Sequence, residues 1–313
     1  MSGKIMILGA CGQIGTELTL RLRKIHGTDQ VIACDIKQGN TELMESGPFE
    51  IVNALDADEL EKTISKHEVS ELYHLVAMLS ATAEQMPLKG WDLNMKSLLI
   101  ALELAKDKKI NKLFWPSSMG AFGPSSPKEN TPQHCVMEPT TVYGISKLAG
   151  EHWCQYYYDK YGVDVRSIRY PGIISYKTLP GGGTTDYAVD IYFKALSESK
   201  YSSFLNKDTT LPMMYMEDAV RATIELMDAP SENLRIRTSY NLAAMSFNPY
   251  EVSKSIQRLI PDFRIDYQPD FRQDIADTWP KSIDDSFAQD DWGWKPKFDL
   301  DQMTDTMLAS IKN

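Results

Sequence analysis

The sequence predicts an α/β fold, a doubly wound parallel sheet with a smaller C-terminal lobe interleaved with it. Short apolar segments alternate with helical patterns from the N-terminus to about residue 174, as such a sheet requires. The first apolar segment leads through a glycine-rich turn directly into a helical pattern. The alternation of apolar segments and helical patterns stops at about residue 175, where we expect the lobe to begin.

The first strand is expected at residues 4–8, a short apolar run typical of a strand buried in a parallel sheet. Gly9, Gly12 and Gly15 follow it and precede a helical pattern at 16–25. The first glycine allows a tight turn, the second lets the backbone approach a pyrophosphate, and the third lets helix and strand pack closely. The helix N-terminus supplies N–H donors for phosphates. We therefore predict a dinucleotide site at Gly9, Gly12, Gln13, Ile14 and Gly15. The alternative is a tight turn that binds no ligand.

The second strand is expected at residues 30–34 and ends at Asp35. A carboxylate in this place accepts hydrogen bonds from the ribose hydroxyls of NAD and repels the 2′-phosphate of NADP. We therefore expect NAD as the cofactor, with Lys37 nearby weakening the discrimination. A loop aspartate that caps a turn is the alternative interpretation.

Tyr143 and Lys147 have the i, i+4 spacing that puts two side chains on one face of a helix. An ammonium beside a phenol favours the phenolate, so we expect Lys147 to lower the pKa of Tyr143 and make it a base. A serine hydroxyl nearby, in the pair Ser117-Ser118, can hold a substrate oxygen. This set predicts proton removal from an alcohol while a hydride leaves its carbon. The alternative is an amphipathic helix with a snorkelling lysine.

Together these motifs resemble the extended short-chain dehydrogenases/reductases over almost the whole chain. The segments that carry the resemblance are the glycine turn, the acidic strand end, residues 114–123 (FWPSSMGAFG), residues 143–147 (YGISK) and residues 169–173 (RYPGI). The resemblance implies a Rossmann core that binds NAD, with Ser118, Tyr143 and Lys147 as catalytic residues. It also implies further cofactor contacts near the adenine, along the fourth strand and beside the nicotinamide, at Leu55, Asp56, Leu75, Ala77, Asn94, Ser117, Tyr143, Lys147, Tyr170 and Ile173.

The lobe segment at 175–193 contains three consecutive glycines followed by two threonines and an aspartate. No arginine occurs between Arg169 and Arg221, so a nucleotide diphosphate would lack bidentate clamping there. With residues 115–123 and 277–284, this segment resembles the short-chain type of L-threonine 3-dehydrogenases. That resemblance implies L-threonine as the substrate, bound by Ser80, Ser118, Tyr143, Thr184, Thr185, Asp186 and Trp279. A helix N-cap explains residues 184–186 equally well, and ordinary packing is the alternative for Trp279.

The expected reaction is therefore oxidation of L-threonine at C3 to 2-amino-3-oxobutanoate, in threonine catabolism. Hydride passes to NAD while Tyr143 acts as general base. A nucleotide-sugar epimerase or dehydratase of the same superfamily is the alternative. A non-enzymatic NAD-sensing protein is the third hypothesis, against which the presence of Ser118, Tyr143 and Lys147 together argues.

The composition agrees with a cytoplasmic enzyme whose thiols are reduced. The chain has 313 residues, a hydrophobic fraction of 42% and a formal net charge of -10, which disfavours binding to nucleic acid or anionic membranes. No apolar run is long enough to span a bilayer. The cysteines and histidines lack metal-ligand spacing, so no metal site is expected. The resemblance implies a homodimer that pairs the Tyr-x-x-x-Lys helix and the helix before it.

We expect the NAD-binding Rossmann domain at residues 1–174, with returning segments at about 211–243. The substrate-binding lobe is expected at 175–210 and 244–313. The two parts therefore interleave along the chain.

Overall fold

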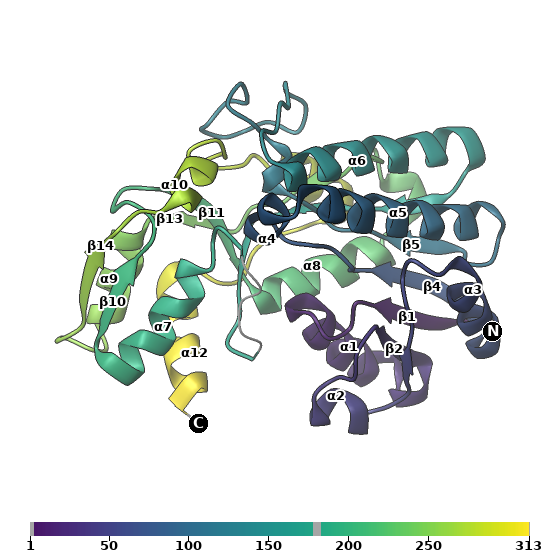
Figure 1. Ribbon diagram of the computed structural model, residues 1–313, viewed down its shortest axis with the longest axis horizontal. Helices are drawn as coiled ribbons and strands as arrows, with labels where there is room; N and C mark the ends of the chain where they lie inside the picture. The colour runs from purple at the N-terminus through teal and green to yellow at the C-terminus, as the bar shows by residue number, and fades with distance from the viewer. Residues whose placement is uncertain (1–2, 178–182, 313) are drawn as a thin grey trace.

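The computed structural model describes residues 3–177 and 183–312, and a six-stranded parallel sheet lies at its centre (Figure 1). The order of strands is β3-β2-β1-β4-β5-β7. Their bounds are β1 (Lys4–Leu8), β2 (Val31–Asp35), β3 (Phe49–Ile51), β4 (Val69–His74), β5 (Lys112–Phe114) and β7 (Asp164–Arg166). Every neighbouring pair is parallel. The predicted doubly wound parallel sheet is confirmed.

Helices cover both faces of this sheet. One face packs against α1 (Gln13–His26) and α8 (Met216–Asp228), and the other against α3 (Ala57–His67), α5 (Pro87–Lys106) and α6 (Val142–Tyr161). The side chains of β1 explain why both faces need a cover of helices. Ile5 and Ile7 join the apolar cluster that contains Leu18 of α1, whereas Met6 and Leu8 join the cluster on the opposite face. Alternate side chains of a strand point to opposite faces, so a run without polar residues is buried on both.

The chain reverses its winding direction at β1, which lies between β2 and β4. Ligands of doubly wound sheets bind outside the carboxyl ends of the strands at such a point. Gly9 follows β1 and Leu75 follows β4, so both residues stand at this crevice. The topology therefore locates the cofactor end of the site.

Three small sheets extend the core. They are β6 (Ser117–Ser118), β8 (Ile168–Tyr170) and β12 (Tyr240–Asn241); β9 (Gly172–Ile174), β11 (Leu211–Tyr215) and β13 (Met245–Phe247); and β10 (Lys200–Ser203) with β14 (Arg264–Tyr267). In the first of them Ser118 pairs with Tyr170, which brings the serine strand beside the segment after β8.

A separate apolar cluster holds the lobe together. It packs α7 (Tyr187–Glu198), α9 (Pro249–Gln257) and α12 (Leu300–Lys312), and includes Tyr187, Tyr192 and Met307. These elements gather on the left of Figure 1, away from α2 and α3 on the right. The boundary expected at residue 174 falls at the end of β9. The remaining helices are α2 (Thr41–Glu45), α4 (Ser80–Gln85), α10 (Phe271–Ala276), α11 (Ser286–Trp292), η1 (Thr28–Gln30), η2 (Met119–Ala121) and η3 (Ser231–Asn233).

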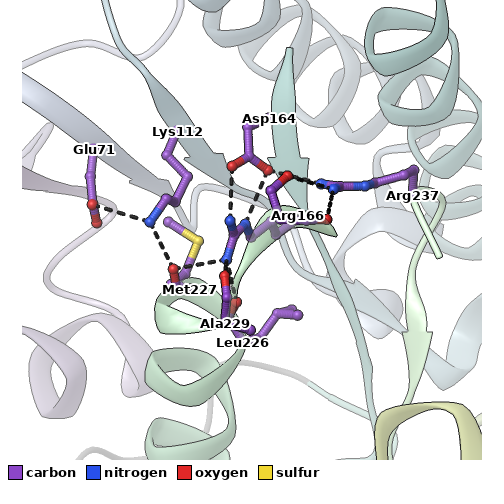
Figure 2. Close-up of polar contacts among 9 residues, drawn as sticks. Glu71, Lys112, Asp164, Arg166, Leu226, Met227, Ala229 and Arg237 are labelled. Carbon is purple, nitrogen blue, oxygen red and sulfur yellow. Dashed lines mark hydrogen bonds and ion pairs between the residues drawn. The ribbon is translucent and has the colours of Figure 1, made fainter. Parts of the chain in front are cut away.

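Two cations tie the C-terminal end of α8 to the sheet (Figure 2). Lys112 Nζ donates to Met227 O at 2.8 Å. Arg166 Nη1 donates at 2.7–2.9 Å to the carbonyl oxygens of Leu226, Met227 and Ala229. Asp164 pairs with Arg166 on one side and with Arg237 on the other. Cations stabilise the negative end of a helix dipole, so this cluster fixes α8 against β5 and β7.

Within the described ranges, no helix combines the length and apolar character needed to cross a membrane.

Candidate active site

A cavity of about 440 Å³ opens at the carboxyl ends of β1 and β4. Most of the site residues predicted from the sequence line it, from the glycine turn, the segment after β4, β6, α6, the segment after β8 and the lobe. They are Gly9, Gly12, Gln13, Ile14, Gly15, Leu75, Ala77, Ser80, Ser117, Ser118, Tyr143, Lys147, Tyr170, Ile173, Thr184, Thr185, Asp186 and Trp279. The fold thus brings residues from both ends of the chain to one place.

The glycine turn has the shape that a dinucleotide requires. Gly9 has φ 91°, in the left-handed region that favours glycine. A Cβ on Gly15 would lie 2.2 Å from Gly9 O, so no side chain fits there. Gly12 is the N-cap of α1 and carries no side chain to shield the helix N-terminus, which faces the cavity. Backbone N–H groups and the positive end of the helix dipole suit a pyrophosphate, so these residues fit the cofactor.

Asp35 lies at the end of β2 and is bound to the glycine turn. Its Oδ2 accepts a hydrogen bond of 2.9 Å from Cys11 N. Cys11 and Lys37 line the cavity, whereas Asp35 itself is not among the lining residues. The carboxylate therefore borders the cavity through the turn that it supports.

Leu55, Asp56 and Asn94 are also absent from the cavity lining. Asp56 is the N-cap of α3, and its Oδ1 accepts a 3.0 Å hydrogen bond from Glu59 N. Asn94 Oδ1 accepts from Met78 N at 2.7 Å, and its Nδ2 donates to Met78 O at 3.2 Å. Asn94 therefore holds the segment between β4 and α4, and the cofactor contacts at these three positions stay predictions.

The predicted catalytic residues meet on one side of the cavity. Ser118 is the N-cap of η2, where its Oγ accepts from Gly120 N at 3.1 Å. Tyr143 and Lys147 lie in the first turns of α6, and Lys147 Nζ is 5.5 Å from the centre of the Tyr143 ring. The same ammonium donates to Pro116 O at 2.5 Å. The i, i+4 spacing in the sequence therefore brings the Lys147 ammonium close to the Tyr143 ring.

The pKa of Tyr143 differs from the expectation. Burial raises it to about 12, and a hydrogen bond with Ser118 acts in the opposite direction. Burial also lowers the pKa of Lys147 to about 7. Desolvation is the largest cause for each group, and neither group is among the causes of the other's shift, so the effect of Lys147 on the pKa of Tyr143 stays a prediction.

Ser117 and Ser118 have different partners. Ser117 is buried, and its Oγ donates to Glu151 Oε1 at 2.5 Å. Glu151 is paired with Arg169 at 2.7 Å, and both side chains are buried. The prediction overlooked Glu151, although its i, i+4 spacing from Lys147 signals that both belong to one helix face. Ser118 is the serine whose hydroxyl interacts with Tyr143.

The lobe supplies the other end of the cavity. Ser80 Oγ and Thr184 Oγ1 lie 3.2 Å apart. Asp186 occupies the N-cap position of α7 but does not cap it with its side chain, because Oδ2 accepts from Gly183 N at 2.7 Å. The first two glycines of this loop, at 181–182, lie outside the described residues. Trp279 is 5% exposed and lines the same end.

Several lining residues were not predicted from the sequence. They are Cys11, Leu79, Pro116, Met119, Pro171, Gly172 and Gly183, whereas Lys37, which also lines the cavity, was expected near the cofactor. Most are neighbours of predicted residues, so adjacency was the available signal. In the part of the chain that the structure describes, no group of three or more His, Cys, Asp or Glu residues is arranged to hold a metal ion.

Comparison with known proteins identifies the family of this chain. The model of the NAD dependent epimerase/dehydratase family matches residues 5–243. An uncharacterized epimerase/dehydratase of Staphylococcus saprophyticus is 52% identical over 99% of this chain and 97% of its own length. A counterpart in Staphylococcus aureus is 51% identical with the same coverage.

Solved structures are equally similar. A partial consensus L-threonine 3-dehydrogenase superposes with a TM-score of 0.97 at 54% identity, over 99% of each chain. The holo form of the L-threonine dehydrogenase from Cupriavidus necator gives 0.96 at 53% identity, over 98% of this chain and 99% of that one. The L-threonine dehydrogenase from Clostridium difficile superposes with a TM-score of 0.96 at 47% identity, over 99% of this chain and 98% of that one. This chain therefore belongs to the NAD-dependent epimerase/dehydratase family of extended short-chain dehydrogenases/reductases, and its cofactor is NAD.

Proposed function

We propose that this protein is an L-threonine 3-dehydrogenase, which oxidises L-threonine at C3 to 2-amino-3-oxobutanoate in threonine catabolism. The observation that carries the proposal is the group of small polar side chains in the cavity lining, Ser80, Thr184, Thr185 and Asp186, which line the cavity together with Trp279. Relatives of similar fold and about half-identical sequence are L-threonine dehydrogenases, which supports the assignment.

The chemistry of these side chains suits a zwitterion. Hydroxyls of Ser80 and Thr184 donate hydrogen bonds, as an amino-acid carboxylate needs. The carboxylate of Asp186 accepts them, as an ammonium needs. Trp279 closes the same end with an apolar surface against which the threonine methyl group packs.

Three residues perform the proton chemistry. Ser118 donates a hydrogen bond to the substrate hydroxyl oxygen and orients it. Tyr143 Oη takes the proton from that hydroxyl, so the rate depends on the fraction of Tyr143 that is deprotonated. Lys147 fixes the start of α6 against Pro116 O, which holds the Tyr143 side chain at the cavity wall. The glycine turn and the N-terminus of α1 would hold NAD⁺, which would supply the hydride acceptor for C3 of the substrate.

A nucleotide-sugar epimerase or dehydratase is the second candidate, because the family model and the staphylococcal relatives carry that description. Such an enzyme must hold a diphosphate. Lys37 and Lys147 are the basic residues among those that line the described cavity, and the set includes no arginine. Lysines bind phosphate as point charges without the bidentate fork of arginine, so the cavity favours the smaller substrate.

The deciding experiment is an NADH absorbance assay with L-threonine, D-threonine, L-serine and UDP-sugars, run with NAD⁺ and NADP⁺ in parallel. The proposal expects turnover with L-threonine and NAD⁺. Turnover of UDP-sugars without turnover of L-threonine contradicts it and establishes the second candidate.

We also propose a homodimer that pairs α5 and α6. Both helices expose large apolar side chains, which a partner copy would bury. They are Leu88 and Trp91 on α5, and Ile145, Trp153, Tyr156 and Tyr161 on α6. Light scattering coupled to size-exclusion chromatography measures the mass in solution, and a monomer at micromolar concentration contradicts the proposal.

A further inference from the structure

Two segments far apart in the sequence pair beside the active site. Lys281 N and Ser282 N donate to Lys128 O at 2.8 and 3.2 Å. Thr131 N donates to Ser282 O at 3.0 Å, and Asp284 N donates to Thr131 O at 3.0 Å. We call this pairing of residues 128–131 with residues 281–284 the clamp. It joins the loop after η2 to the segment that follows Trp279.

The side chain of Lys128 secures the clamp to the end of α10. Its Nζ donates to the carbonyl oxygens of Asp277, Thr278 and Trp279 at 3.2, 2.7 and 3.2 Å. An ammonium has three N–H donors, and here each finds a carbonyl. A cation at the C-terminal end of a helix is also favoured by the helix dipole. Lys128 therefore fixes the backbone that carries Trp279.

Trp279 lines two cavities. One is the active-site cavity, and the other has a volume of about 450 Å³ and is lined by Lys207, Thr209 and Gln273 among others. A core side chain is normally held by close contacts all around it. Trp279 is buried within the apolar cluster of the lobe, so its position depends on that packing and on its backbone, which Lys128 holds.

The clamp is also joined to the catalytic strand through polar side chains. Asn241 Nδ2 donates to Thr131 O at 3.1 Å and to Asp284 O at 3.0 Å. Asn241 Oδ1 accepts from Arg169 at 2.9 Å, and Arg169 pairs with Glu151, the partner of Ser117. These contacts fix the clamp relative to β6. Lys128, which belongs to the clamp, fixes the backbone of Trp279 relative to β6 in turn.

We propose that Lys128 is a positioning residue that holds Trp279 at the substrate end of the cavity and so sets the affinity for the amino acid without touching it. This inference rests on the proposed function for its kinetic consequence. Its structural consequence, the placement of Trp279, does not depend on which substrate is bound.

The kinetic test compares Lys128→Met with wild type. Loss of the ammonium frees three carbonyls and loosens Trp279, so the KM for L-threonine rises roughly tenfold while kcat and the KM for NAD⁺ stay within about twofold. Lys128→Arg restores most of the affinity because a guanidinium also donates to several carbonyls. The matched control is Lys207→Met, which removes a lysine from the wall of the second cavity and leaves the KM unchanged.

A double-mutant cycle separates positioning from general destabilisation. In a Trp279→Ala background, the change Lys128→Met has no further effect on the KM for L-threonine, because the residue through which it acts is gone. Additive effects on KM, or a parallel loss of kcat and of NAD⁺ affinity, overturn the inference.

A measurement without substrate distinguishes failure of this inference from failure of the proposed function. The fluorescence of Trp279 is obtained as the difference between each protein and its Trp279→Phe variant. In the Lys128→Met protein this signal is quenched more strongly by acrylamide than in wild type, since the indole leaves its buried position. Equal quenching in both proteins overturns the inference even if L-threonine is oxidised. Stronger quenching supports it even if another substrate is found.

Discussion

Lys147 Nζ lies 5.5 Å from the centre of the Tyr143 ring, yet it donates its hydrogen bond to Pro116 O, at 2.5 Å. The lysine therefore ties the beginning of α6 to the segment before β6, where Ser118 lies. Both ionisable groups are buried, and burial disfavours the charged form of each. The pKa of Tyr143 in this structure therefore depends on desolvation and on its hydrogen bond with Ser118.

Replacement of Tyr143 by Phe removes the base and keeps the ring. We expect kcat for L-threonine to fall by roughly 10²–10⁴-fold, the usual contribution of a general base. The affinity for NAD⁺, measured by fluorescence titration, stays close to the wild-type value because the glycine turn is unchanged. Turnover near the wild-type rate contradicts the assignment of the base.

Replacement of Ser118 by Ala changes the pH dependence of the reaction. The hydrogen bond with Ser118 lowers the pKa of Tyr143, so its loss raises that pKa further. A base with a higher pKa is deprotonated at higher pH, and the rising limb of log(kcat/KM) against pH moves to the alkaline side. A reduced rate with an unshifted limb shows instead that Ser118 only orients the substrate.

Replacement of Lys147 by Met is expected to abolish activity and to increase the free energy of unfolding below about pH 7. Burial lowers the pKa of Lys147 from 10.5 in the unfolded chain to about 7 in the folded protein. Below about pH 7 the ammonium is charged in both states, so the folded protein bears the full cost of burying it. Between pH 7 and 10.5 the unfolded chain binds more protons, and this cost falls as the pH rises.

The Lys147→Met variant is therefore more stable than wild type below about pH 7, and the difference shrinks toward pH 10. Thermal unfolding across this range measures it, and activity is lost throughout. The control is Lys66→Met, which removes a side chain that is 63% exposed and paired with Glu50, and gives no such gain. A variant less stable than wild type at every pH contradicts the assigned cost.

Replacement of Asp35 by Ala changes the choice of cofactor. The carboxylate that supports the glycine turn through Cys11 N also repels a 2′-phosphate, so its loss raises the ratio of kcat/KM for NADP⁺ to that for NAD⁺ by roughly 10–100-fold. Adding Lys37→Ala to this variant reverses part of the gain, because Lys37 lines the cavity and can pair with the phosphate. If Asp35→Ala leaves this ratio unchanged, the carboxylate of Asp35 supports the glycine turn but does not select the cofactor.

Replacement of Arg166 by Met weakens the attachment of α8 to the sheet. The side chain is 3% exposed, and its loss removes one donor side chain from Asp164, which keeps Arg237, and from three carbonyl oxygens, of which Met227 O keeps Lys112, at a cost of about 3 kcal/mol in the free energy of unfolding. Lys112→Met costs about 1 kcal/mol, since that ammonium is 22% exposed and has one carbonyl partner. Urea unfolding measures both, and equal costs contradict this ranking.

Local patterns predicted the parts of the site that depend on neighbours in sequence. The predicted strand at 4–8 has the same bounds as β1, and Tyr143 and Lys147 share the face of α6 that their spacing indicates. The raised pKa of Tyr143 was missed because it is a sum of desolvation by residues from several elements. The clamp was missed for a related reason, since nothing local in the chain indicates that Lys128 meets Trp279.

The cavity is lined by residues from Gly9 to Trp279, so its two ends are made at different times during synthesis. On a ribosome, β1, β2 and β4 emerge well before the segments of the lobe. The substrate end is completed only after Trp279 and residues 281–284 have left the exit tunnel. A chain that ends before Trp279 therefore contains every residue of the glycine turn but lacks the side chain and the clamp segment that complete the substrate end.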